Sequence, residues 1–301
     1  MPPVMGVAAF LIAASTGTAY IDICAMALLP ALVYYLYLAI SIQIRAVKRE
    51  LPFGAKESQA LAALRESGYL MLFLPVLIWL LAIRTPAAVA ALYTCLILIL
   101  LVGVKKLYLY HSDPRRFLRE MGRFLVHGLR EGAIQGTKIG LILGCLGIMI
   151  ELFVVTGFAQ KISFQMIELS GGYLPLLLFY VALTCLLFGM GMPTTGAYLV
   201  VSILAAPALV KFGVNLVAAH LFVFYYGLMA SVTPPVGIGA IVASGIAKGN
   251  YLRTALHATR LALPGFILPI FFIYRPQILL IDASPLESVL VFLSALIGCV
   301  C

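Results

Sequence analysis

The sequence predicts an all-α, polytopic membrane protein with inverted repeats, a re-entrant hairpin and broken helices. Of its 301 residues, 63% are apolar and 10% are charged, and the mean hydropathy is +1.12. Soluble domains carry about 25% charged residues, so most of this chain is suited to lipid rather than to water. Helices are the expected spanning elements, because backbone groups in lipid must pair within their own segment. The apolar runs are long and continuous, unlike the short alternating strands of a membrane β-barrel.

The positive charge of the chain has two explanations, nucleic-acid binding or membrane orientation. The net charge is +9 at pH 7, and most of the Lys and Arg residues lie in two loops, 45–67 and 105–137. Basic loops between apolar runs set the orientation of a membrane protein. We therefore expect both loops in the cytoplasm, contacts with membrane lipids, and no nucleic-acid partner. The six cysteines and four histidines lack the spacing of a metal site or a disulfide framework, so no cofactor is predicted.

The first half of the chain contains apolar runs of unequal length. The opening run, 4–14, is too short to span a bilayer at roughly 20 residues per crossing. Asp113 or Ser112 caps a predicted amphipathic helix that begins at Pro114 and lies on the membrane surface; a solvated connector is the alternative. The predicted spans of this half are 18–44, 68–83, 87–104 and 138–156.

The second half contains two pairs of apolar arms, each pair interrupted by Gly, Pro and Thr. The arms 173–188 and 196–210 are separated by GMGMPTT, residues 189–195. The arms 216–232 and 236–247 are separated by Thr233, Pro234 and Pro235. A span at 254–274 follows, and residues 276–301 form a C-terminal apolar tail after a membrane domain of residues 1–275.

The chain also contains an internal repeat with an offset of about 232 residues. Its opening MPPVMGVAAFLIAASTGTAY is similar to TPPVGIGAIVASGIAKGNY near the C-terminus. The orientation set by the basic loops makes the two copies inverted, and inverted repeats with broken helices indicate a transporter site near the bilayer midplane. The matched pairs are Pro2 with Pro234, Pro3 with Pro235, Gly17 with Gly249, Tyr20 with Tyr251, and Pro30 with Pro264.

The chemistry of these breaks suits ion and anion binding. Tandem prolines remove two backbone donors and clash with the preceding turn, so the helix must unwind. Unwound carbonyls and half-helix C-termini can hold Na⁺, and half-helix N-termini can face an anion. Ordinary kinks or surface turns are the alternative, because Pro and Gly are common in membrane helices. The predicted substrate- or ion-binding residues are Pro2, Pro3, Gly189, Gly191, Pro193, Thr194, Thr195, Ser231, Thr233, Pro234, Pro235 and Gly237, with Na⁺ near Thr194, Thr195 and Thr233.

Residues 189–198 and 231–245, with the opening motif, resemble the large membrane (M) subunit of TRAP transporters. The closest resemblance is to the fused type that works with TAXI-class binding proteins, and it covers most of residues 1–275. It implies an elevator-type carrier of the ion transporter superfamily, in the bacterial inner membrane. Its expected function is Na⁺-coupled import of an organic anion, usually a carboxylate. The implied partners are a periplasmic binding protein and a small membrane subunit or its fused equivalent.

By the same resemblance, 173–211 is the second hairpin and 216–247 the second broken helix. Ser231, Thr233 and Gly237 beside the break are then further candidates for ion or substrate contact. The first repeat starts at its own Pro-Pro motif, so we expect an N-terminally truncated chain whose first hairpin is absent. Glu151, within a span, is a further departure from the family pattern.

Three other functions remain open from the sequence. An inverted-repeat ion or anion carrier could work without a binding protein, and an inactive fragment could act as a scaffold subunit. An intramembrane enzyme would need His, Asp or Cys clustered within spans, and Glu151 and Arg260 are the ionisable residues offered. We therefore predict that the chain is not an enzyme.

Overall fold

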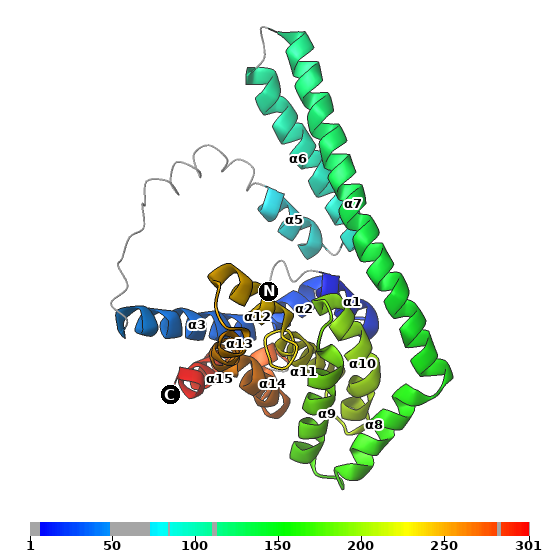
Figure 1. The fold of residues 1–301 in the computed structure, drawn as a ribbon, viewed down its shortest axis with the longest axis vertical. Helices are drawn as coiled ribbons and strands as arrows, with labels where there is room; N and C mark the ends of the chain where they lie inside the picture. The colour runs from blue at the N-terminus through cyan, green and yellow to red at the C-terminus, as the bar shows by residue number, and fades with distance from the viewer. Residues whose placement is uncertain (1–6, 49–72, 84, 110–112, 282–283, 301) are drawn as a thin grey trace. The chain divides into compact units, whose positions relative to one another are not determined.

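The computed structural model is helical throughout the parts of the chain that it describes, and no strand occurs there (Figure 1). These parts are residues 7–48, 73–83, 85–109, 113–281 and 284–300. The chain divides into two compact units, Pro52–Leu143 and the pair Met1–Leu51 with Gly144–Cys301. We call the former the smaller unit and the latter the core unit.

The smaller unit contains α5 (Phe73–Ala82), α6 (Ala87–Leu109) and the first part of α7 (Pro114–Val155). Lys106 of α6 donates to the carbonyl oxygen of Glu120 on α7 at 2.8 Å, and its Nζ lies 5.5 Å from the centre of the Phe124 ring. A Cβ at Gly103 would lie 3.0 Å from Met121 Cε. The apolar face predicted for the surface helix therefore contacts α6, and the two helices run side by side (Figure 1).

Helix α7 joins two elements that the sequence predicts as separate. The N-terminal boundary is as predicted, because α7 begins at Pro114 and the Asp113 carboxylate accepts from Arg116 N at 3.2 Å. The separation of the amphipathic helix that begins at Pro114 from the 138–156 span is wrong, since α7 continues for 42 residues to Val155. The linking residues contain glycine but no proline, so nothing in them removes a helical hydrogen bond.

The core unit begins with three helices, α1 (Val7–Thr16), α2 (Tyr20–Met26) and α3 (Leu28–Lys48). The sequence predicts one span over 18–44, whereas the structure divides it at Ala27. Helices α1 and α2 meet at a bend of 110°. Pro30 lies in the first turn of α3 and not in the middle of a span, and its missing N–H costs no helical hydrogen bond there.

The predicted hairpin and broken helix are present in the core unit. After α8 (Phe158–Leu169), the hairpin arms are α9 (Leu174–Gly189) and α10 (Thr194–Lys211). The broken helix consists of α11 (Leu216–Met229) and α12 (Ile238–Ala247). Asn215 caps α11, since its Oδ1 accepts from Val217 N at 2.9 Å.

The C-terminal part of the core unit continues the same helical packing. The predicted 254–274 span is two helices, α13 (Tyr251–Leu261) and α14 (Leu263–Tyr274), which together form one candidate span of 24 residues. The segment 276–301 contains the short 3₁₀ helix η2 (Pro276–Leu279) and α15 (Pro285–Val300). Ile278 and Leu279 of η2 are fully buried in the core cluster of this unit.

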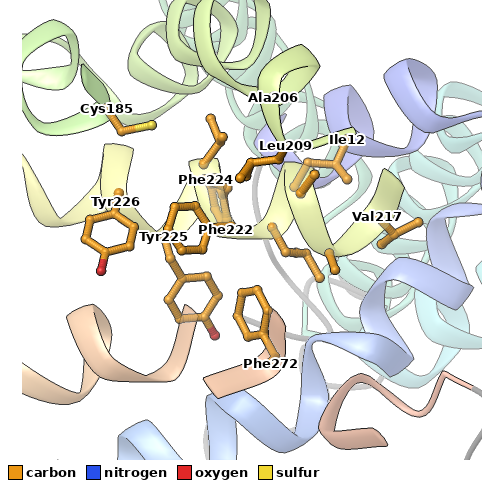
Figure 2. Close-up of a cluster of buried hydrophobic side chains, with 14 of the residues drawn as sticks. Ile12, Cys185, Ala206, Leu209, Val217, Phe222, Phe224, Tyr225, Tyr226 and Phe272 are labelled. Carbon is orange, nitrogen blue, oxygen red and sulfur yellow. The ribbon is translucent and has the colours of Figure 1, made fainter. Parts of the chain in front are cut away.

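The core of this unit lies around α11 (Figure 2). Side chains from α1, α9, α10 and α14 point toward this helix, among them Ile12, Cys185, Leu209 and Phe272 (Figure 2). The Tyr225 and Phe272 rings lie 5.8 Å apart, edge to face. Twelve residues of α11 are buried, and they lie on all sides of the helix. This is expected of a largely apolar helix that is surrounded by others.

Five helices among the described residues are long and apolar enough to cross a membrane, and the bent pair α1 and α2 makes a sixth candidate. Two of the five are α6 and α7, and most of the residues in their apolar windows are exposed to the surroundings. Exposed apolar helices are suited to lipid and not to water. The predicted fold class, a polytopic helical membrane protein, is confirmed.

Candidate functional site

The tip of the hairpin is a four-residue turn between α9 and α10. Gly191 has a φ of +73°, a left-handed conformation that glycine adopts without steric cost. Pro193 precedes α10 with an extended backbone, and its carbonyl oxygen accepts from Ala197 N at 2.9 Å. Thr194 and Thr195 form the first turn of α10, with Thr194 exposed and Thr195 half-buried. The predicted tip residues therefore lie at the end of α9, in the turn and at the start of α10.

The break in the second pair is wider than the three residues predicted for it. Helix α11 ends at Met229 and α12 begins at Ile238. The Ser231 hydroxyl donates to the carbonyl oxygen of Leu228 at 2.7 Å, and the Thr233 hydroxyl donates to that of Met229 at 2.6 Å. These side chains bind the last turn of α11, and hydroxyl groups in such positions compete with the regular helix.

The break is tightly folded around Gly237. A Cβ at this buried residue would lie 3.1 Å from the Val232 carbonyl carbon and 3.2 Å from the oxygens of Ser231 and Thr233. Contacts at these distances are tighter than usual, so a side chain here would require the loop backbone to move by a few tenths of an ångström. The Ser231 carbonyl oxygen accepts from Gly239 N at 2.9 Å, which closes the loop, and the Pro234–Pro235 peptide within it is cis.

Two side chains of α13 form hydrogen bonds with backbone atoms of the break. The Tyr251 hydroxyl donates to the Pro235 carbonyl oxygen at 2.8 Å and accepts from Gly237 N at 3.1 Å. The Thr259 hydroxyl lies 3.3 Å from the Val232 carbonyl oxygen. The unwound backbone is therefore fixed by side chains that come from the next helix of the chain.

The hairpin tip and the break contact each other within the core unit. A Cβ at Gly189 would lie 3.0 Å from Ala230 Cβ and 3.2 Å from the Gly227 carbonyl oxygen. A Cβ at Gly191 would lie 3.7 Å from Val236 Cγ1. The glycines at the end of α9 thus permit a close approach to the end of α11. The structure brings together two segments that the sequence separates by some forty residues.

Four helix ends surround this junction. Helices α9 and α11 end here at Gly189 and Met229, and α10 and α12 begin here at Thr194 and Ile238. Helix C-termini carry partial negative charge and helix N-termini partial positive charge. The Ser231 and Thr233 hydroxyls donate their protons to helix carbonyls, so their oxygen lone pairs face outward as acceptors. The junction can therefore favour a cation and an anion side by side.

The structure places most but not all of the predicted residues. Pro2 and Pro3 lie outside the described residues, so the pairing of the two Pro-Pro motifs stays a prediction. Tyr251 could be found from the sequence, since it matches Tyr20 in the repeat. Thr259, Gly227 and Ala230 had no signal, because their roles depend on neighbours that the fold supplies.

A comparison with known protein families identifies the family of this chain. The family model described as "Tripartite ATP-independent periplasmic transporter, DctM component" matches residues 1–286. A comparison with curated proteins found no match. The family match covers most of the chain, so the chain belongs to the DctM family. It is thus the membrane component of a TRAP-type secondary transporter.

Proposed function

We propose that this DctM-family chain is the membrane subunit of a Na⁺-coupled importer of an organic anion, and that a carboxylate is the substrate class. The observation that carries the proposal is the contact between the hairpin tip and the break, where Gly189 meets Ala230 and Gly227. Irregular backbone at membrane depth is tolerated where it is buried or lines a cavity, so a junction of two such segments is a binding region.

The proposed Na⁺ contacts are the oxygens of Thr194, Thr195 and Thr233, with carbonyls of the unwound turns. Sodium prefers hard oxygen ligands, and broken membrane helices offer them through unwound carbonyls and half-helix C-termini. A substrate carboxylate would face the N-termini of α10 and α12, where backbone N–H groups point toward an anion. Adjacent binding of both charges lets each stabilise the other, which couples the Na⁺ gradient to uptake.

We further propose an elevator mechanism in the bacterial inner membrane. Its support is the division of the chain, since the hairpin and the broken helix belong to the core unit while α5, α6 and most of α7 belong to another. The proposed partners are a periplasmic substrate-binding protein of the TAXI type and a small membrane subunit or its fused equivalent. The binding protein would select the substrate and deliver it to the junction.

The test is uptake by the chain reconstituted with these partners in proteoliposomes. We expect accumulation of labelled organic acids that requires both an inward Na⁺ gradient and the binding protein. In Thr233→Ala and Thr195→Val, we expect half-maximal uptake to need at least about tenfold more Na⁺, which corresponds to about 1.4 kcal/mol. Unchanged Na⁺ dependence in both variants would remove these residues from the site, and uptake without any Na⁺ gradient would contradict the coupling.

A further inference from the structure

A pocket of the core unit lies toward the end of α10 that is opposite the hairpin tip. Its volume is about 460 Å³, within the range of small-molecule sites. Its lining on α10 extends from Ser202 to Lys211, seven to sixteen residues from Thr195, or about 10–24 Å along a helix that rises about 1.5 Å per residue. The pocket is therefore separate from the junction to which the transport function is assigned. Its polar lining residues are Ser15, Gln160, Ser163, Ser202, Lys211 and His220.

The Ser163 hydroxyl is the strongest sign that this pocket takes a ligand. Ser163 is 2% exposed, and among the described residues its Oγ has no hydrogen-bond partner. A buried polar group without a partner costs about 1–3 kcal/mol. A ligand that accepts from this hydroxyl inside the pocket would remove that cost.

The neighbouring polar groups form a fixed cluster. The Tyr198 hydroxyl lies 2.9 Å from His220 Nδ1, and the Ser15 and Ser202 side chains lie close to the same hydroxyl. Tyr198 is fully buried, and 9% of His220 is exposed. When the Tyr198 hydroxyl donates to Nδ1, the neutral imidazole carries its proton on Nε2. His220 is then a donor to any ligand that accepts from this nitrogen.

The charge of the pocket favours an anion. Lys211 is its charged lining residue, and no carboxylate occurs among the described residues that line it. The serine hydroxyls, the Gln160 amide and a neutral imidazole can all donate to an anion. These are donors that a carboxylate or a phosphate accepts from readily, with the Lys211 ammonium as the opposite charge.

The remaining lining of the pocket is apolar, and its outer part is open. Val210 and Leu216 line the pocket together with Lys211 and are 38% and 39% exposed, and Ile203 and Pro207 line it from earlier turns of α10. A lysine beside exposed apolar side chains at a helix end is typical of the membrane interface. Such a surface suits an acyl chain, whose head would reach the hydroxyl cluster.

We propose that this pocket binds an anionic amphiphile, with its carboxylate or phosphate head between Ser163, His220 and Lys211 and its chain along Val210 and Leu216. Two sources share this chemistry, an anionic phospholipid of the surrounding membrane and a free fatty acid. The site goes beyond the proposed transport function and does not depend on it.

Native mass spectrometry of the full chain in neutral detergent tests the proposal with three probes. These are dioleoyl phosphatidylglycerol, dioleoyl phosphatidylcholine and oleate. We expect phosphatidylglycerol, oleate or both to bind at least about fivefold more tightly than phosphatidylcholine, a difference typical of one charge-assisted contact. Preference for the phospholipid or for oleate identifies the source of the head group.

Variants locate the site. Ser163→Ala and Lys211→Gln should each weaken binding of the preferred probe roughly fivefold or more. Lys161→Gln on α8, an exposed lysine outside the pocket lining, is the matched control for charge and should change binding less than about twofold. Thr195→Val at the hairpin tip should also leave it unchanged. The proposal would be overturned if the two phospholipids bind equally well and oleate is not retained. It would also be overturned if neither Ser163→Ala nor Lys211→Gln weakens binding.

Discussion

The two copies of the internal repeat, α1–α3 and α12–α14, have similar backbones and different surroundings. In each copy the first helix is followed by a left-handed residue, Gly17 with a φ of +65° and Lys248 with a φ of +49°. The second helix then begins at a tyrosine, Tyr20 or Tyr251. The third follows after an alanine and carries a proline in its first turn. The tyrosine, the alanine and the proline are residue types that both copies share, whereas the left-handed residue is a glycine in one copy and a lysine in the other.

The two copies differ in which of their side chains are buried. In α1, Ala9 and Ile12 are fully buried, and the helix packs against α10 and α11. In α12, Ala240 and Ser244 are buried, whereas Ile241 is 49% exposed and Ile246 is 81% exposed. The repeat therefore sets the path of the backbone, whereas the neighbours of each copy decide what its side chains contribute to stability. The predictions below test this separation.

The largest expected effect is from Ile12→Ala in the buried copy. Removing a packed side chain leaves a cavity, and such changes cost about 2–5 kcal/mol in well-packed cores. The same substitution at the exposed Ile246 of the other copy, Ile246→Ala, should alter the free energy of unfolding by less than about 0.5 kcal/mol. Denaturant titration of the purified chain in detergent measures both. Equal losses in the two variants would mean that the copies do not differ in packing.

A smaller loss is expected from Gly237→Ala at the break that precedes α12. The added Cβ would lie 3.1–3.2 Å from backbone atoms of residues 231–233, and overpacking of this kind costs about 1–3 kcal/mol. In Gly245→Ala, the control within α12, the new Cβ meets nothing within 4 Å. That variant should be neutral or stabilised by up to about 1 kcal/mol, since alanine favours a helix. Thermal unfolding distinguishes the two, and a stable Gly237→Ala would show that the break can widen.

Tyr251→Phe removes two of the hydrogen bonds that join α13 to the break, those of the Tyr251 hydroxyl with Pro235 and Gly237. The buried Gly237 N–H then loses its acceptor, at a cost of about 1–3 kcal/mol. Tyr20→Phe is the corresponding change in the first copy, where the ring stacks on Phe10 at 4.1 Å. We expect a smaller loss there, because phenylalanine keeps the stacking. If unfolding measurements show the larger loss at Tyr20, the fixing role assigned to Tyr251 is wrong.

The smallest effect is expected from Thr259→Val on α13. Its hydroxyl also bonds Ala255 within its own helix, so the contact with Val232 is a shared one at 3.3 Å. We expect a loss of about 0.5–1.5 kcal/mol. Thr254→Val on the same helix removes a bond to Asn250 alone, next to the start of α13, and should cost less. Hydrogen exchange at residues 230–237 should rise in the Thr259 variant and stay unchanged in the Thr254 variant.

The sequence predicted those parts of the fold that depend on local chemistry. The hairpin tip was predicted from GMGMPTT, because glycine and proline leave few backbone conformations open. The start of α7 was predicted from Asp113 and Pro114, because an aspartate can cap a helix and proline is favoured at its first position. The early end of α11 was missed, because it depends on which carbonyls the Ser231 and Thr233 hydroxyls reach.

The parts that were missed depend on distant neighbours. The contact of Gly189 with Ala230 joins residues some forty positions apart, and no spacing in the sequence indicates it. The same holds for Thr259 and Val232, and for the pocket between α8, α10 and α11 that contains Ser163. The predicted residues of the junction were found through glycine, proline and threonine, whereas the residues that hold them in place belong to the tertiary fold.

Equilibrium binding of ²²Na⁺ to the purified chain, assembled with its partner subunits, tests the central claim most directly. The account predicts saturable binding whose affinity falls at least about tenfold in Thr195→Val and in Thr233→Ala. The same affinity should remain in Thr254→Val, whose hydroxyl lies outside the junction. An assembled protein that binds no Na⁺, or one that binds it equally well in both junction variants, would contradict the assignment of the cation site to the hairpin tip and the helix break.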